Sequence, residues 1–146
     1  MKIIINEDET LEETVVTVSC RRLTPELAKM LSGFQMLEEQ LVVTKGKETC
    51  FLKMDEVMYI ESVDRKTFVY TGGDVYESAF RLCELEERLA EYGFFRAGRS
   101  CLIQLGYIRS LKSDIDRRIR VTMENGEQLI VSRQYAEELK KRLGVR

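Results

Sequence analysis

Residues 93–105 read GFFRAGRSCLIQL, and this stretch decides how the rest of the chain is interpreted. Four polar side chains, Arg96, Arg99, Ser100 and Gln104, stand on a predicted basic loop between apolar segments. Arginine binds phosphates and guanine edges, whereas serine and glutamine hydrogen-bond to bases or to the nucleic-acid backbone. The loop therefore has the composition of a nucleic-acid interface.

Residues 129–135 read LIVSRQY and form a second block, which ends in the expected start of a helix. Ser132 is the expected N-cap of that helix and Arg133 its first residue. Backbone N–H groups at a helix start attract phosphate, and the Arg133 side chain is expected to stand free beside them. Arg133 is therefore the strongest single candidate for a contact to a nucleic acid.

Residues 59–66 read YIESVDRK and form a third block, which precedes the other two. Arg65 and Lys66 follow a strand pattern and fall at the predicted tip of a hairpin. Long basic side chains project freely from such a tip and can reach phosphates. The alternative is a turn whose charges only keep it soluble.

The three blocks, in this order and with this spacing, resemble the LytTR family of bacterial DNA-binding domains. The resemblance covers roughly residues 40 to 143. It implies an elongated assembly of β-sheets that spans successive major grooves and reads bases with loops. The residues expected to contact DNA are Arg65, Lys66, Arg96, Arg99, Ser100, Gln104 and Arg133.

Two positions depart from the pattern of that family. Gln104 stands where family members usually carry asparagine, and its longer amide either pairs with adenine or bonds to its own loop. Gly98 stands where they often carry histidine, which removes a polar contact and adds backbone freedom. DNA binding stays the expectation, but the target sequence does not follow from these residues.

The composition fits one domain with a small appendage. Of the 146 residues, 44% are hydrophobic and 33% are charged, which is enough to bury a core. No apolar run approaches the ~18 residues that cross a bilayer. The apolar run at the start of the chain is too short, and the residues that follow it are too acidic, for a signal peptide. We therefore expect a cytoplasmic protein.

The absence of histidine argues against an enzyme. It excludes Ser-His and Cys-His nucleophiles and histidine-ligated metals, and no glycine-rich phosphate loop is present. Cys20, Cys50, Cys83 and Cys101 lie far apart without a C-x-x-C pair, so they are expected to behave as small hydrophobic residues. A redox role for Cys101 is the alternative. We expect no catalysis, no cofactor and no metal.

The charge of the chain is unevenly distributed. The net charge is −2, but residues 1–44 hold four bases and eight acids, while residues 93–120 hold seven bases and two acids. A local basic stripe suffices to engage phosphates, because charges are screened beyond ~10 Å. The alternative for Arg117, Arg118 and Arg120 is that they only keep the exposed face of a strand soluble.

Residues 41–146 predict a β-rich α+β fold with antiparallel sheets and two or three short helices. Apolar and polar residues alternate over many short runs, as in half-buried strands. Asn125-Gly126 predicts a type I′ hairpin turn between two of these strands. This part corresponds to the expected LytTR-like DNA-binding domain.

Residues 1–40 predict a small strand–strand–helix extension. Lys2–Ile5 and Val15–Cys20 are β-branched runs typical of strands, and Thr24-Pro25 is a helix start. The helix has an apolar face, formed by Leu27, Met30, Leu31 and Phe34. This face packs either on the neighbouring strands or on a second copy, and the second alternative predicts a homodimer.

The expected function is that of a sequence-specific transcriptional regulator, which binds double-stranded DNA in promoter regions through its loops. The alternative is a β-rich protein-interaction module that does not bind DNA, as the net negative charge would allow. About 40 residues precede the DNA-binding part, too few for the receiver domain of a response regulator. The resemblance therefore implies a standalone regulator, and it implies a small membrane protein as a regulatory partner.

Overall fold

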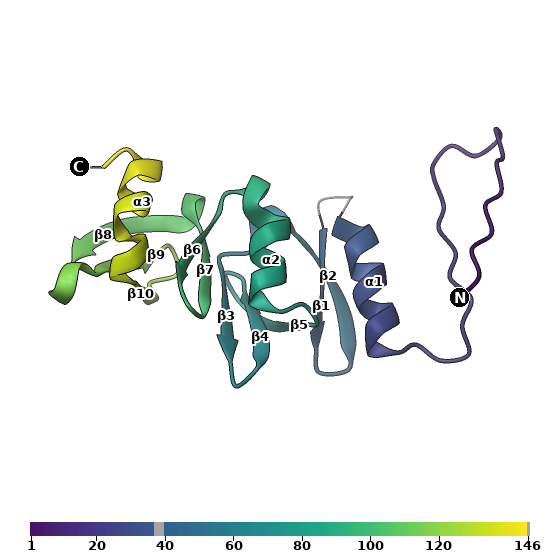
Figure 1. The fold of residues 1–146 in the computed structure, drawn as a ribbon, viewed down its shortest axis with the longest axis horizontal. Helices are drawn as coiled ribbons and strands as arrows, with labels where there is room; N and C mark the ends of the chain where they lie inside the picture. The colour runs from purple at the N-terminus through teal and green to yellow at the C-terminus, as the bar shows by residue number, and fades with distance from the viewer. Residues whose placement is uncertain (37–39, 146) are drawn as a thin grey trace.

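The computed structural model describes residues 1–36 and 40–145. In these residues, antiparallel strands make up most of the chain between residues 40 and 131, and three α-helices pack against them (Figure 1). The N-terminal segment lies at one end of the long axis of the molecule, and the smaller sheet with the last helix lies at the other end. The predicted β-rich α+β class is confirmed. The helices are α1 (Pro25–Met36), α2 (Leu82–Leu89) and α3 (Arg133–Leu143).

The larger sheet has seven strands in the order β2-β1-β5-β4-β3-β7-β6, and all neighbours are antiparallel. Side chains alternate between its faces, so that Leu41 and Val43 are buried while Thr44 is exposed. Its strands are β1 (Gln40–Lys45), β2 (Glu48–Lys53), β3 (Tyr59–Val63), β4 (Lys66–Tyr70), β5 (Val75–Ser78), β6 (Phe94–Gly98) and β7 (Cys101–Gln104).

The smaller sheet has three strands in the order β10-β9-β8. In its central strand Ile119, Val121 and Met123 are buried while Arg120 is exposed, which confirms the predicted alternation. The strands are β8 (Ile108–Ser113), β9 (Ile119–Met123) and β10 (Gln128–Val131). Short 3-10 turns lie between strands or after α2, at Met54–Glu56, Ala90–Tyr92, Leu105–Tyr107 and Ile115–Arg117.

The turn between β9 and β10 differs from the prediction. Gly126 has the expected left-handed φ of 89°, but Asn125 is not among the residues with positive φ, and a type I′ turn needs two of them. The Gly126 N–H donates to Met123 O at 2.9 Å, so the chain reverses through a three-residue loop that ends in a left-handed glycine. The predicted hairpin is confirmed, and the predicted turn type is wrong.

Two hydrophobic clusters hold the sheets and helices together. In the first, Leu85 and Leu89 of α2 pack with Ile60 and Phe80 against the larger sheet. In the second, the smaller sheet and α3 pack against the outer strands of the larger sheet, through residues that include Val121, Leu139 and Phe95. The second cluster joins the two sheets and thereby fixes α3 next to β6.

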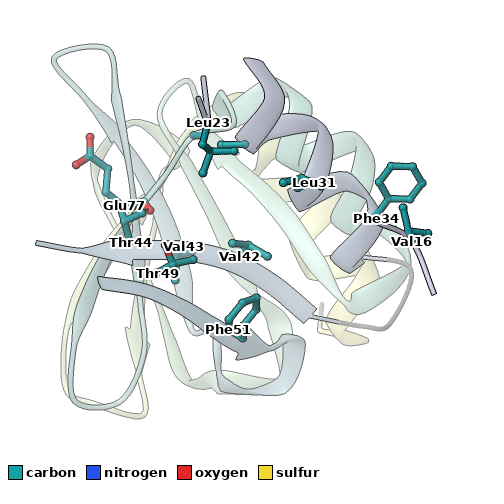
Figure 2. Close-up of a pocket in the computed structure, with 12 residues that line it drawn as sticks. Val16, Leu23, Leu31, Phe34, Val42, Val43, Thr44, Thr49, Phe51 and Glu77 are labelled. Atoms are coloured by element: carbon teal, nitrogen blue, oxygen red, sulfur yellow. Dashed lines mark hydrogen bonds between the residues drawn. The ribbon is translucent and has the colours of Figure 1, made fainter. Parts of the chain in front are cut away.

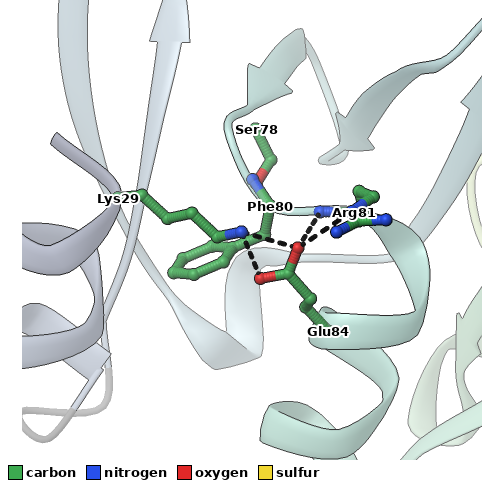
Figure 3. Close-up of polar contacts among 5 residues, drawn as sticks. All are labelled: Lys29, Ser78, Phe80, Arg81 and Glu84. Atoms are coloured by element: carbon green, nitrogen blue, oxygen red, sulfur yellow. Dashed lines mark hydrogen bonds and ion pairs between the residues drawn. The ribbon is translucent and has the colours of Figure 1, made fainter. Parts of the chain in front are cut away.

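Helix α1 begins as predicted and is tied to α2 by charged side chains (Figure 3). Thr24 Oγ1 accepts a hydrogen bond from Leu27 N at 3.2 Å, as an N-cap does. Lys29 Nζ lies 2.5 Å from Glu84 Oε2 and 5.7 Å from the centre of the Phe80 ring. The hydrogen bond from Lys29 lowers the pKa of Glu84 below its ordinary value. The N-terminal helix is thus attached to the body of the protein.

The two predicted N-terminal strands do not form. Residues 1–24 contain no helix or strand, and the runs Lys2–Ile5 and Val15–Cys20 are exposed to solvent. A strand needs a partner for its backbone N–H and C=O groups, and an isolated pair of strands is at best marginally stable in water. These runs have strand composition, but they have no partner strand in the described part of this chain. The boundary between residues 1–40 and 41–146 stays a prediction.

Candidate nucleic-acid interface

The basic residues that the sequence placed on a loop lie on a hairpin instead. β6 and β7 pair with each other, and only Arg99 and Ser100 lie between them. The prediction of a loop over residues 96–104 is therefore wrong, because the apolar alternation continues through the basic residues and buries Ala97 and Leu102. The tight turn leaves Arg99 and Ser100 exposed at the end of the sheet.

Arg96 holds the shape of this turn. Its Nε donates to Gly98 O at 2.6 Å and its Nη2 donates to Arg99 O at 2.6 Å. Its Nη1 lies 3.1 Å from Glu86 Oε2 of α2, and the side chain is only 21% exposed. A register shift between Arg96 and Gly98 marks a bulge, which redirects the side chains that follow. The guanidinium group thus binds two backbone carbonyls of the turn and one carboxylate of α2.

A polar groove opens beside the turn and has a volume of about 390 Å³. It joins three chain segments that are far apart in sequence: the β6–β7 turn, the β8–β9 turn and the first turn of α3. Three arginines and one aspartate give it a positive balance. The lining residues are Arg99, Asp116, Arg118, Ser132, Arg133, Gln134 and Tyr135.

Hydrogen bonds and ring packing fix the walls of this groove. Ser132 N donates to Ala97 O at 2.9 Å, which holds the start of α3 against β6. The Tyr135 ring packs edge-on against Phe95, with a centroid distance of 6.4 Å. Ser132 occupies the N-cap position of α3 without a side-chain cap hydrogen bond. The predicted helix start at Arg133 is confirmed, and the Arg133 side chain is exposed.

The β3–β4 hairpin presents the third predicted block. Asp64 and Arg65 have φ of 51° and 66°, so this two-residue turn has the type I′ geometry. Neither residue is glycine, and each adopts a left-handed conformation that costs energy for an ordinary side chain. Arg65 and Lys66 are both exposed at the tip.

The β3–β4 tip and the β6–β7 turn lie at the same end of their strands. Ser62 N, near the end of β3, donates to Ser100 O at 2.9 Å. Figure 1 shows these turns and the beginning of α3 along the lower edge of the molecule. The structure therefore brings together six of the seven predicted residues along one edge: Arg65, Lys66, Arg96, Arg99, Ser100 and Arg133.

Gln104 does not join the other six residues. It is the last residue of β7 and pairs with Phe94, at the opposite end of the strand from the turn. Its backbone N donates to Met58 O at 2.9 Å, and its Oε1 is buried without a hydrogen-bond partner in the described structure. The geometry places this amide among strands, away from the groove.

The position of Gly98 is open. A Cβ added there would meet no atom within 4 Å, and the backbone has no positive φ that demands glycine. The departure from histidine therefore reflects no steric need in this chain.

Five groove residues were absent from the predicted DNA contacts: Asp116, Arg118, Ser132, Gln134 and Tyr135. Arg118 belongs to the basic stripe that the sequence singled out, but only the fold brings it next to Arg133. Arg120 of the same stripe donates to Asp114 at 3.1 Å and to Gln128 at 3.3 Å, so its guanidinium is occupied on the sheet. Gln134 could have been identified from the sequence, because it follows Arg133 directly in the first turn of α3.

Cys101 lies near the interface but is poorly suited to redox chemistry. Burial is the main cause that raises the pKa of its thiol to about 12. The thiol is therefore protonated at neutral pH, and the thiolate is the reactive form. The geometry favours the role of a small hydrophobic residue.

Within residues 1–36 and 40–145, no group of three or more cysteine, aspartate or glutamate side chains is arranged to hold a metal ion. In the same part of the chain, no helix is both long and apolar enough to span a membrane.

The chain is similar to a known protein family and to a solved structure. Residues 47–144 match the family described as the LytTr DNA-binding domain. A solved LytTr DNA-binding domain from Bacillus cereus resembles this chain with a TM-score of 0.69 and 27% sequence identity. The similarity covers 73% of this chain and 97% of the other.

Curated proteins with similar sequences cover different shares of their own length. The Sensory transduction protein LytT of Bacillus anthracis is 26% identical over 122 residues, which are 82% of this chain and 50% of that protein. Its namesake in Bacillus cereus is 30% identical over 94 residues, 64% of this chain and 38% of that protein. This chain thus spans half or less of these two. An uncharacterized HTH-type transcriptional regulator of Staphylococcus aureus is 22% identical over 147 residues, 99% of this chain and 98% of that protein.

Proposed function

Because the chain belongs to the LytTr DNA-binding domain family, we propose that it is a transcriptional regulator that binds double-stranded DNA in a sequence-specific manner. The observation that carries this proposal is the groove in which Arg99, Arg118 and Arg133 converge from three separate turns. Convergent arginines with exposed side chains are suited to adjacent phosphates or guanine edges. The name of the Staphylococcus aureus relative, a transcriptional regulator, supports the same function.

We assign different roles to the residues of the interface. Arg99, Arg118 and Arg133 contact phosphates or guanine, and Ser100 hydrogen-bonds to the DNA backbone. Gln134 lies in the first turn of α3, where its amide can pair with an adenine edge. This assignment gives the groove both positioning contacts and a base-reading contact.

Arg65 and Lys66 supply a second contact region at the β3–β4 tip. Arg96 acts through the turn that it holds, as a positioning residue. Gln104 remains a proposed contact that would require its buried amide to become accessible. Two separate regions along one edge agree with the expectation that the domain spans successive major grooves.

The partners of the protein are also proposals. We infer that promoter DNA is bound by a homodimer, since α1 leaves Met30 and Phe34 at 38% and 43% exposure. A binding protein of this kind would act in the cytoplasm and would perform no catalysis. The proposal that a small membrane protein regulates this chain rests on the family resemblance alone.

Fluorescence anisotropy with the DNA upstream of the protein's own gene tests the proposed function. Scrambled DNA of equal length is the control, and the titration is repeated at several salt concentrations. Binding through four to six phosphate contacts should give a log–log slope of affinity against salt of about −4 to −5. We expect tight and salt-sensitive binding with a preference for the upstream DNA.

Other outcomes have defined meanings. Salt-sensitive binding without sequence preference would contradict the sequence-specific part of the proposal for this DNA. The absence of salt-sensitive binding to any duplex would favour the β-rich protein-interaction module instead.

A further inference from the structure

A second groove lies at the other end of the molecule, between α1 and the β1–β2 hairpin (Figure 2). It has a volume of about 300 Å³ and is lined mostly by apolar side chains. Phe51 of β2 lies on its floor and is 56% exposed, and Phe34 of α1 lies on its rim and is 43% exposed. Aromatic side chains with this exposure make the groove a candidate site for another apolar segment.

The groove lies beside an open edge of the larger sheet. β2 is the first strand in the order of the sheet and pairs with β1 on one side. In the described residues no strand pairs with its other side, so that side presents free backbone N–H and C=O groups. An open strand edge next to an apolar groove is the geometry that accepts an added strand.

The N-terminal segment has the composition of the missing strand. Residues 15–20 equal β2 in length, and alternation places Val16, Val18 and Cys20 on one face of such a strand. In the single chain this segment is not a strand, and Val16 is 58% exposed. Figure 1 shows most of the N-terminal segment beyond α1, while Val16 and Leu23 line the groove and Val16 lies beside Phe34 without pairing to β2 (Figure 2).

The charges around the two partners are complementary in a parallel arrangement. Residues 7–13, which precede the segment, include five carboxylates and no base: Glu7, Asp8, Glu9, Glu12 and Glu13. β2 has an exposed lysine at each end, Lys47 just before it and Lys53 as its last residue. A parallel addition would bring the acidic residues near Lys47, and Arg21 and Arg22 after the segment near Asp55 and Glu56, whereas an antiparallel addition would bring Arg21 and Arg22 near Lys47.

We propose that residues 15–20 of a second copy add to the open edge of β2 and place Val16 and Val18 in the groove beside Phe51. The exchange is reciprocal, so two copies form a closed symmetric dimer in which both segments are covered. This inference deepens the homodimer part of the proposed function and rests on it. It does not require DNA binding.

Cross-linking of mixed chains tests the exchange directly. All chains carry Cys50→Ser and Cys83→Ser. They keep Cys101, because its thiol is largely buried. One chain keeps Cys20 as the probe on the segment. The other carries Cys20→Ser and Thr49→Cys, which puts the probe on an exposed position of β2. The two chains differ in mass by a tag, are unfolded and refolded together, and are treated with a flexible bismaleimide. We expect a cross-linked species that contains one chain of each mass.

Sedimentation measures how strongly the same contact stabilises the dimer. Phe51→Glu should weaken the dimer about tenfold or more, because it puts a charge into the apolar contact. Ile130→Glu is the matched control, since Ile130 is a similarly exposed apolar strand residue on the other sheet, at 42%. Both variants should keep the circular dichroism spectrum of the parent.

Each other result has one meaning. A protein that is monomeric at all concentrations would overturn both this inference and the proposed homodimer. A dimer without the mixed cross-link, or one that Phe51→Glu leaves intact, would overturn this inference alone. A third chain that holds both Cys20 and Thr49→Cys detects self-pairing: a link within monomers alone would also overturn it. None of these results bears on DNA binding.

Discussion

Arg133 is the residue on which the proposed interface depends most, because it is exposed at the start of α3 and lines the groove with Arg99 and Arg118. We predict that Arg133→Ala weakens binding to the target DNA by ~1–3 kcal/mol. Lys141→Ala removes the same charge from the last turn of the same helix and serves as the control. Anisotropy titrations measure the affinities, and circular dichroism checks the fold. Equal affinities for the parent and Arg133→Ala would remove Arg133 from the interface.

Arg96 is expected to act differently, since its guanidinium already binds Gly98 O, Arg99 O and Glu86. Arg96→Ala should loosen the turn, so that hydrogen exchange at the Arg99 and Ser100 amides becomes faster and DNA affinity falls. Arg96→Lys should not restore either property, because an ammonium group cannot match the planar set of three contacts. Unchanged exchange in Arg96→Ala would show that the turn keeps its shape without this residue.

At the scale of elements, the ion pair between α1 and α2 gives the docking of α1 a pH dependence. The pKa of Glu84 is lowered in the folded protein by the hydrogen bond from Lys29. Its stabilising effect is therefore complete above the ordinary pKa of 4.5 and is lost as the pH falls through the lower folded value. Glu84→Gln should lower the free energy of unfolding at pH 7, and the difference from the parent should disappear in acid.

Urea unfolding between pH 7 and pH 3 measures this effect. Glu87→Gln, an exposed residue of the same helix, is the control and should follow the parent. A Glu84→Gln variant that remains less stable than the parent by the same amount at pH 3 would contradict the prediction, because the loss would then not depend on ionisation.

Elements that are covered by a second layer could be predicted from the sequence, and the others could not. Alternation identified β9 correctly, since one face of this strand is buried under α3 and the other is exposed. The run Val15–Cys20 has the same alternation but no partner in the described chain, and strand composition alone does not supply one. In the stretch 93–105, the basic residues masked two strands, because a bulge and a two-residue turn accommodate them.

The candidate site follows the same distinction. Its local features could be predicted: Arg133 begins a helix, and Arg65 stands at a hairpin tip. Which residues share a groove depends on how the two sheets pack, and this is why Arg118 and Gln134 were missed as contacts. Gln104 was grouped with Arg99 because they are close in sequence, but a β-strand carries them to opposite ends.

At the scale of the whole molecule, the interface consists of two regions along one edge. The β3–β4 tip carries Arg65, whereas Arg133 lies in the groove with different neighbours. Substitutions at sites that share no partners add within about 0.3–0.5 kcal/mol. We therefore predict that the double variant Arg65→Ala/Arg133→Ala loses the sum of the two single losses in DNA binding free energy. Anisotropy titrations of the four proteins measure this, and a double loss well below the sum would place both side chains on one DNA contact.

The order of the strands also bears on how fast the chain folds. Most strand pairings in the described residues join neighbours in sequence, as in β1–β2, β3–β4, β6–β7 and β8–β9. Two pairings, β1–β5 and β3–β7, close longer loops. Short loops close at little entropic cost, so the hairpins can form first and independently. The rate of refolding should then be set by the step that brings the β6–β7 hairpin against β3, since this step adds the hairpin to the other five strands of the larger sheet.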